Sequence, residues 1–300
     1  MSFNDIIGQD RVCEFLKQAY FSNRLAHAYL FVGPEGSGKK ECALEFAKFV
    51  NCAAEEGIKK NQGACDKCRN CRKVNNGRHP EIEVITADGA SITIEQIRDI
   101  QKSVQYKRVE SKYRCVIINE SDKMTKEAAN AFLKTLEEPP QGTIIILLTS
   151  GISGLLTTII SRCQLVRFRM LSQEEKTVIV MKGIDASEDD SKTALFSAGG
   201  NIKRAREILN DEDDTIELFK NLELAYINKR GSSDVLDMFS DLARDKKRFG
   251  AWIDFLVNRQ DERILTQKDG FKEIEFLLDI KTQYNRNVNS QILWAKMMLR

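Results

Sequence analysis

Short apolar runs alternate with amphipathic patterns over the first half of the chain. The runs are rich in β-branched or aromatic residues, which is typical of strands that are buried on both faces. They span residues 28–32, 82–86, 115–118 and 144–149, and a fifth strand is predicted at 165–168. Between the runs, apolar residues recur at helical spacing. Strands that alternate with helices in this way predict a parallel α/β sheet.

The pattern becomes entirely helical after the fifth predicted strand. Ser172 and Glu175 have the spacing of a capping box, so we expect a helix to begin there. The acidic cluster at 210–214 marks a second boundary. The sequence therefore predicts an α/β domain over 1–170, a small helical domain over 171–209 and a helical bundle over 210–300.

Composition narrows the class of protein. The 300 residues carry 46 Lys and Arg against 44 Asp and Glu, a net charge of +2, and 42% of them are hydrophobic. These values exclude a disordered chain, a collagen and a polybasic nucleic-acid tail. The first residues lack the apolar core of a signal peptide, so we expect a cytoplasmic protein with reduced cysteines.

A glycine-rich segment has the context of a phosphate-binding loop, because it follows an apolar strand and precedes an amphipathic helix. Its backbone N–H groups would converge on phosphate oxygens, and its lysine would reach the terminal phosphates. The residues predicted to form it are Gly33, Gly36, Ser37, Gly38, Lys39 and Lys40.

Two positions depart from what Mg²⁺-ATP requires. The motif places a hydroxyl after the lysine as a magnesium ligand, and this chain has Lys40 there. The strand at 115–118 should be followed by an aspartate, but Asn119 and then Glu120 follow it. We therefore predict a degenerate site with little or no Mg²⁺-dependent ATP hydrolysis, although Glu120 could still orient a water molecule.

Four cysteines have the spacing of a metal site. Cys52, Cys65, Cys68 and Cys71 form a C-x12-C-x2-C-x2-C pattern, which predicts a structural zinc module over about residues 52–71. A complete thiolate shell leaves no open position for catalysis, and binding would contribute on the order of 10 kcal/mol to folding. Basic residues surround the cluster, so a zinc-dependent nucleic-acid binding module is an alternative.

Several motifs together resemble one family, the bacterial DNA polymerase III clamp-loader subunits of the AAA+ superfamily, and within it the delta-prime type. The motifs are Phe3 to Gln9, His27 to Phe31, the phosphate loop, the cysteine insert, Asn130 to Pro140, and Ser161-Arg162-Cys163. The resemblance spans nearly the whole chain. It implies that the α/β domain has the AAA+ fold, that residues 171–209 form a lid, and that residues 210–300 form the collar of a five-subunit ring.

The resemblance also implies residue roles. Arg162 would be an arginine finger that acts in the nucleotide site of a neighbouring subunit. Thr149 would lie near the sensor-1 position, and Lys203 with Arg204 near the sensor-2 position. The implied partners are gamma/tau-like motor subunits, a delta-like subunit, the sliding clamp and primed DNA, within a DNA polymerase holoenzyme.

Two interpretations of the function differ in which subunit hydrolyses ATP, a neighbouring motor subunit or this chain. In the first, a delta-prime-like subunit completes the ring and supplies Arg162 in trans while its own site is inactive. In the second, the chain is an active AAA+ motor in which Lys39 and Glu120 suffice despite Lys40 and Asn119. The departures at Lys40 and Asn119 favour the first reading.

Overall fold

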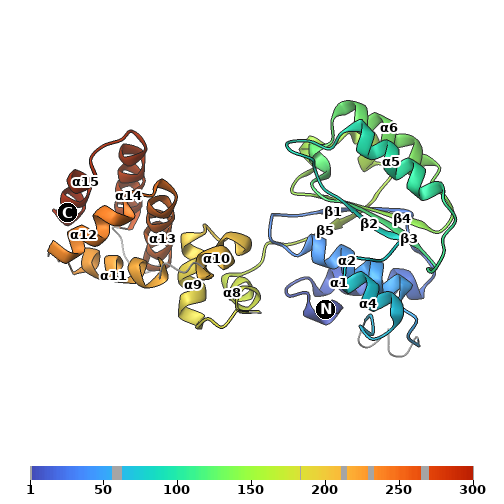
Figure 1. Cartoon of the computed structure of the whole chain (residues 1–300), viewed down its shortest axis with the longest axis horizontal. Helices are drawn as coiled ribbons and strands as arrows, with labels where there is room; N and C mark the ends of the chain where they lie inside the picture. The colour runs from blue at the N-terminus through green and yellow to red at the C-terminus, as the bar shows by residue number, and fades with distance from the viewer. Residues whose placement is uncertain are drawn as a thin grey trace. The chain divides into compact units, whose positions relative to one another are not determined.

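The computed structural model describes residues 2–55, 63–182, 184–210, 215–228, 233–264 and 270–299. It divides the chain into two compact units, Met1–Leu171 and Ser172–Arg300 (Figure 1). The part of the predicted zinc module at 56–62 and the acidic cluster at 211–214 lie outside the described residues.

A five-stranded parallel sheet forms the centre of the first unit, which confirms the predicted α/β fold. Its strands follow the order β2-β3-β4-β1-β5. Their bounds are Ala28–Val32 for β1, Ile82–Ile85 for β2, Arg114–Ile118 for β3, Thr143–Thr149 for β4 and Gln164–Arg167 for β5. Every residue of β3 and β4 is buried, as apolar runs without alternation predict.

Helices cover both faces of the sheet (Figure 1). Tyr29 and Phe31 of β1 pack on one side with α1 and α2, while Ala28 and Leu30 pack on the other with α5 and α6. The helices of this unit are α1 (Asp10–Phe21), α2 (Lys39–Asn51), α4 (Arg69–Asn75), α5 (Ile94–Gln105), α6 (Lys126–Glu137) and α7 (Thr157–Ile160). Short 3-10 turns occur at Phe3–Asp5, Ser121–Lys123 and Ile152–Gly154.

Strand register brings the loops with predicted site residues to one edge of the sheet. Val32, the last residue of β1, lies opposite Thr149 of β4 and Arg167 of β5. The phosphate loop therefore begins beside the ends of both neighbouring strands.

The second unit is helical. Ser172 and Glu175 form the predicted capping box at its first helix, with both backbone N–H groups bonded to the partner's side chain. The helices are α8 (Gln173–Met181), α9 (Glu188–Ser197), α10 (Ile202–Leu209), α11 (Thr215–Ile227), α12 (Ser233–Leu242), α13 (Lys246–Ile264), α14 (Gly270–Asn285) and α15 (Ser290–Met298). Among the described residues, no helix has the length and apolar character needed to span a bilayer.

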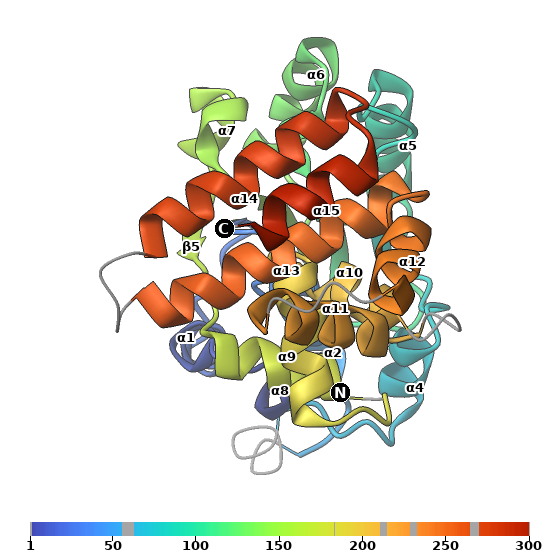
Figure 2. The same cartoon turned by 90° about the vertical axis from the view of Figure 1, so that its left-hand side faces the viewer.

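An aromatic core holds the later helices together. Phe239, Trp252 and Trp294 contact one another, and the ring centroid of Phe239 lies 4.6 Å from that of Trp294. Figure 2 shows α13 and α14 alongside each other, and these helices contact each other along their length. Phe196 of α9 joins this core, and its carbonyl accepts a hydrogen bond from Asn258 of α13 at 2.7 Å. Both predicted helical domains thus belong to one compact unit, and their division at residue 210 stays a prediction.

Candidate functional site

The phosphate loop connects β1 to α2 and depends on its glycines. Gly36 and Gly38 have φ values of 74° and 84°, a region that side chains other than glycine rarely adopt. A Cβ atom on Gly33 would lie 2.6 Å from the carbonyl oxygen of Phe168. The N–H group of Gly33 donates to the carbonyl of Thr149 at 3.2 Å. The loop is therefore packed closely against the last residue of β4 and the residue that follows β5.

Lys39 points back into this loop. Its ammonium donates to the carbonyls of Gly33 at 2.6 Å and Pro34 at 2.7 Å, and lies 3.4 Å from the hydroxyl of Ser37. Burial lowers the pKa of Lys39, and nearby carboxylates, among them that of Asp122, oppose this shift. A phosphate would have to compete with two backbone carbonyls for the ammonium.

The two expected magnesium-ligand positions hold an ammonium and a carboxamide. Lys40 is exposed in the first turn of α2. Asn119 follows β3 directly, and its backbone N–H donates to the carbonyl of Ile85 at 2.9 Å. Glu120 has a φ of 50°, and its carboxylate pairs with Lys123 at 2.9 Å. The structure thus brings Lys39 into the loop while Glu120 is held by a neighbour on its own turn.

Thr149 and Asp122 join the ends of β4 and β3. The hydroxyl of Thr149 donates to Asp122 at 2.8 Å, and Ser121 donates to the carbonyl of Leu148 at 2.9 Å. Asp122 was not among the predicted site residues, although its position three residues after Asn119 was a local signal. Lys203 is exposed on α10 of the second unit, so its assignment stays a prediction.

Gln9 is a further residue that sequence reasoning did not assign to the site. Its side chain is 3% exposed, and its amide donates to the carbonyls of Ser37 at 3.1 Å and Arg169 at 2.9 Å. Its oxygen accepts the N–H of Arg169 at 3.3 Å. Gln9 therefore ties the phosphate loop to the segment that ends the first unit at Leu171.

The four predicted metal ligands come together. Their sulfur atoms all lie within 4.8 Å of one another, and those of Cys65 and Cys71 are 3.9 Å apart. A tetrahedral zinc site with Zn–S bonds of about 2.3 Å places its sulfurs about 3.8 Å apart. The set contains four thiols and no other ligand type, so both its spacing and its chemistry fit zinc.

Backbone N–H groups point at the sulfur atoms. Cys65 and Ala54 each donate to the sulfur of Cys52 at 3.4 Å. A hydrogen bond from Cys71, followed by these two N–H groups, lowers the pKa of Cys52 to about 4 against the opposing effect of burial. The same bond raises the pKa of Cys71. The N–H groups that point at Cys52 therefore favour its thiolate, the form of cysteine that binds metal.

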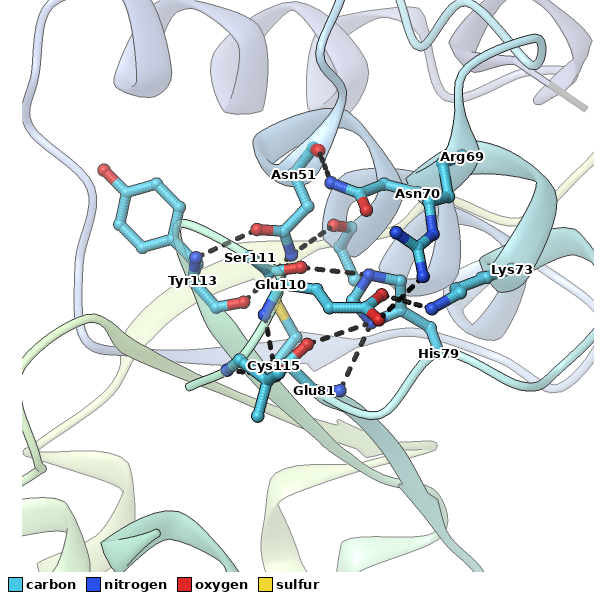
Figure 3. Close-up of polar contacts among 12 residues, drawn as sticks. Asn51, Arg69, Asn70, Lys73, His79, Glu81, Glu110, Ser111, Tyr113 and Cys115 are labelled. Carbon is cyan, nitrogen blue, oxygen red and sulfur yellow. Dashed lines mark hydrogen bonds and ion pairs between the residues drawn. The ribbon is translucent and has the colours of Figure 1, made fainter. Parts of the chain in front are cut away.

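The basic residues near the cysteines are partly neutralised. Arg69 and Lys73 of α4 both pair with the carboxylate of Glu110 (Figure 3). Lys67, Arg72 and Arg78 are exposed. A nucleic-acid surface would have to displace Glu110 to use Arg69 and Lys73, which weakens that alternative.

Arg162 lies on the turn after α7. Its guanidinium pairs with Glu137 of α6 at 2.6 Å and donates to the carbonyl of Thr158 at 2.9 Å. The side chain is 35% exposed. Two anchors thus direct a guanidinium that solvent, or a neighbouring molecule, can reach.

Comparison with known proteins identifies relatives. A family profile described as "DNA polymerase III, delta subunit" matches residues 8–172. DNA polymerase III subunit delta' of Bacillus subtilis is 41% identical over 54% of this chain and 48% of its own length. Subunit gamma of Buchnera aphidicola (strain APS) is 31% identical over 80% of this chain and 64% of its own, and subunit tau of B. subtilis 32% identical over 82% and 46%. The chain thus spans between about half and two thirds of the length of these relatives.

Proposed function

Because the chain belongs to the family of bacterial DNA polymerase III clamp-loader subunits, we propose that it is the delta-prime-like, non-motor subunit of such a loader. It completes a cytoplasmic ring with gamma/tau-like motor subunits and a delta-like subunit. ATP use by the motors then places the sliding clamp on primed DNA. The observation that carries the proposal is the phosphate loop itself, which keeps its glycines but has Lys40 and Asn119 at the two magnesium positions.

The catalytic part of the proposal is Arg162. A guanidinium placed against the γ-phosphate of a neighbouring subunit stabilises the charge of the transition state, and such fingers contribute about 10³ to 10⁵ in rate. The pairing of Arg162 with Glu137 supports this role, since it orients the side chain without burying it. Zinc at the four cysteines supplies folding free energy and no reaction step.

Calorimetric titration of the isolated full chain with ATP, with and without Mg²⁺, tests the first part. We expect no tightening by Mg²⁺ and no hydrolysis in the same sample, because neither the hydroxyl nor the aspartate is present. Mg²⁺-dependent binding with turnover would overturn the proposal.

Exchange of Arg162 for alanine in the reconstituted ring tests the second part. Arg162→Ala should leave ring assembly intact and slow the motor's hydrolysis by at least tenfold. Arg24→Ala, at an exposed arginine of the same unit, is the matched control and should leave the rate unchanged. Equal rates for both variants would remove the finger assignment.

A motor subunit is the alternative, and the alignments give it one specific support. The gamma and tau relatives align over 80% and 82% of this chain, whereas the delta' relative aligns over 54%. The same ATP titration separates the two, since a motor binds and hydrolyses Mg²⁺-ATP at its own site.

A further inference from the structure

The residues that lead into β3 form a loop that hydrogen bonds hold beside the cysteines. We define this lead-in loop as residues 106–113 and the cysteine module as the described residues 51–55 and 63–75, which include α4. Two apolar side chains of the loop stand in solvent, with Tyr106 70% and Val109 83% exposed. The backbone of the loop, in contrast, is held by hydrogen bonds at residues 109, 110 and 113, and the side chain of Ser111 is held as well.

Asn51 makes one of the buried connections. It is 4% exposed, and its side chain pairs with the backbone of Tyr113, accepting the N–H at 2.9 Å and donating to the carbonyl at 3.0 Å. The backbone carbonyl of Asn51 accepts a hydrogen bond from Asn70 at 2.8 Å (Figure 3). Asn51 therefore joins α2, α4 and the lead-in loop at one point.

Glu110 connects the loop to α4. Its carboxylate accepts from Arg69 at 3.3 Å and also pairs with Lys73 (Figure 3). The hydrogen bond from Lys73 is the main reason that the pKa of Glu110 lies below its ordinary value. Both cations come from the helix that carries Cys71, so this contact depends on the position of α4.

His79 and Glu81 hold the same loop from the segment after α4. The ring Nδ1 of His79 accepts the N–H of Glu81 at 3.2 Å, which places the proton on Nε2, from where it is donated to Ser111 at 3.0 Å. Burial lowers the pKa of His79 and so favours this neutral form. The carboxylate of Glu81 accepts the N–H groups of Val109 at 2.8 Å and Glu110 at 3.3 Å.

Several of the residues that hold the loop lie next to metal ligands along the chain. Asn51 directly precedes Cys52, and both Arg69 and Asn70 lie between Cys68 and Cys71. A metal ion that fixes the four sulfurs fixes the backbone from which these side chains extend. Residues that orient metal ligands without touching the metal typically change its affinity by about 10- to 100-fold.

We propose that the cysteine module positions the lead-in loop, so that zinc binding and the conformation of residues 109–113 are thermodynamically linked. Zinc holds the loop in the described conformation, and the loop contacts in turn raise the affinity for zinc, because such coupling is reciprocal. The exposed side chains of Tyr106 and Val109 are then presented in one arrangement only in the zinc-loaded chain. This inference rests on the zinc assignment within the proposed function, and not on the role of the chain in the ring.

Zinc affinity, measured on the isolated full chain by competition with a chromogenic chelator, tests the linkage. Glu110→Gln removes the partner of Arg69 and Lys73, and we expect the affinity to fall severalfold. Asp99→Asn removes an exposed ion pair with Lys102 on α5 and is the matched control, for which we expect a change of less than twofold. Asn51→Ala should weaken zinc binding by at least about tenfold, and Ser111→Ala provides a milder variant if that chain does not fold.

Hydrogen exchange provides the reciprocal measurement. Removing zinc from the wild-type chain should lower the protection of residues 109–113 while leaving that of β4 unchanged. Equal zinc affinities for Glu110→Gln, Ser111→Ala and the control would overturn the linkage. The same conclusion would follow if the exchange protection of residues 109–113 were equal with and without zinc. A chain that binds no zinc would remove the zinc assignment as well, whereas the ATP titration and ring assembly test the clamp-loader role independently.

Discussion

Glu45 of α2 should titrate near neutral pH, and its replacement by glutamine should reverse a pH-dependent loss of stability. The residue is 2% exposed, and its carboxylate lies 2.8 Å from the ammonium of Lys48. The ammonium of Lys48 also forms an ion pair with Asp66 and a hydrogen bond to Asn75, so Glu45 is not its only partner. Burial raises the pKa of Glu45 to about 7, and Lys48 only partly offsets this effect.

The size and sign of the effect follow from linkage. The pKa of Glu45 rises from 4.5 to about 7, a difference of about 2.5 units, and one unit corresponds to about 1.36 kcal/mol. Between these values the folded chain keeps a proton that the unfolded chain has lost, so the free energy of unfolding falls as pH rises. The loss attributable to Glu45 begins near pH 4.5, reaches about 3 kcal/mol near pH 7 and stays constant above it.

Glu45→Gln removes this titration while Lys48 keeps its bonds to Asp66 and Asn75. We therefore expect the variant to gain stability relative to wild type as pH rises from 5 to 8. Both Trp residues lie in the second unit, so tryptophan fluorescence would not report the unfolding of the first unit, which contains Glu45. The assay should therefore be urea-dependent hydrogen exchange of β3 and β4, corrected for the intrinsic exchange rates at each pH. Carbon NMR of the labelled carboxyl groups gives the pKa directly, with the variant as its assignment control.

The reasoning fails if the difference in stability between the two proteins is the same at pH 5 and pH 8. A pKa near 4.5 for the Glu45 carboxyl would refute it independently, since it would mean that Lys48 fully compensates the burial.

Three further substitutions test packing around the site. Gly33→Ala should destabilise the first unit by about 1–3 kcal/mol, since its Cβ would overlap the backbone of Phe168, and urea-dependent exchange of β1 would measure the loss. Gln9→Ala should cost about 1–3 kcal/mol because it removes the hydrogen bonds that the buried side chain of Gln9 makes to the backbone of Ser37 and Arg169, and exchange at residues 37 and 169 should rise while that of β3 does not. Thr93→Ala removes the cap of α5 and should cost about 1 kcal/mol, seen as earlier fraying of residues 94–97.

The buried strands could be predicted because their signal is local. Short runs rich in β-branched or aromatic residues predicted all five strands to within about one residue at each end. The misses are polar residues at strand starts, such as Arg114 of β3, which is 8% exposed because its guanidinium donates to the carbonyl of Tyr106 at 3.1 Å. The cysteine cluster was predictable for the same reason, since three of its four ligands lie within seven residues.

The polar residues that assemble the site had no such signal. Gln9 bonds to Arg169, 160 residues away, and Asn51 bonds to Tyr113, 62 residues away. Neither residue stands in a periodic pattern, and an isolated amide is ordinarily read as surface. Their roles follow from the sheet, which brings the ends of its strands together, and so become visible only after the chain has folded.

The two departures at the magnesium position should act jointly, and this can be tested by restoring them. Magnesium takes near-octahedral oxygen ligands and keeps several waters, so a hydroxyl at position 40 or a carboxylate at position 119 alone supplies only one of the two protein positions that the motif uses to hold the ion. We expect Lys40→Thr and Asn119→Asp to have little effect separately, and together to make ATP binding tighten at least tenfold with Mg²⁺ in calorimetry. Adding Lys39→Ala to the double variant should abolish the gain, because Lys39 must leave the carbonyls of Gly33 and Pro34 to meet the phosphates. If the double variant binds ATP equally with and without Mg²⁺, then Lys40 and Asn119 do not control the magnesium dependence of ATP binding, and the prediction is wrong.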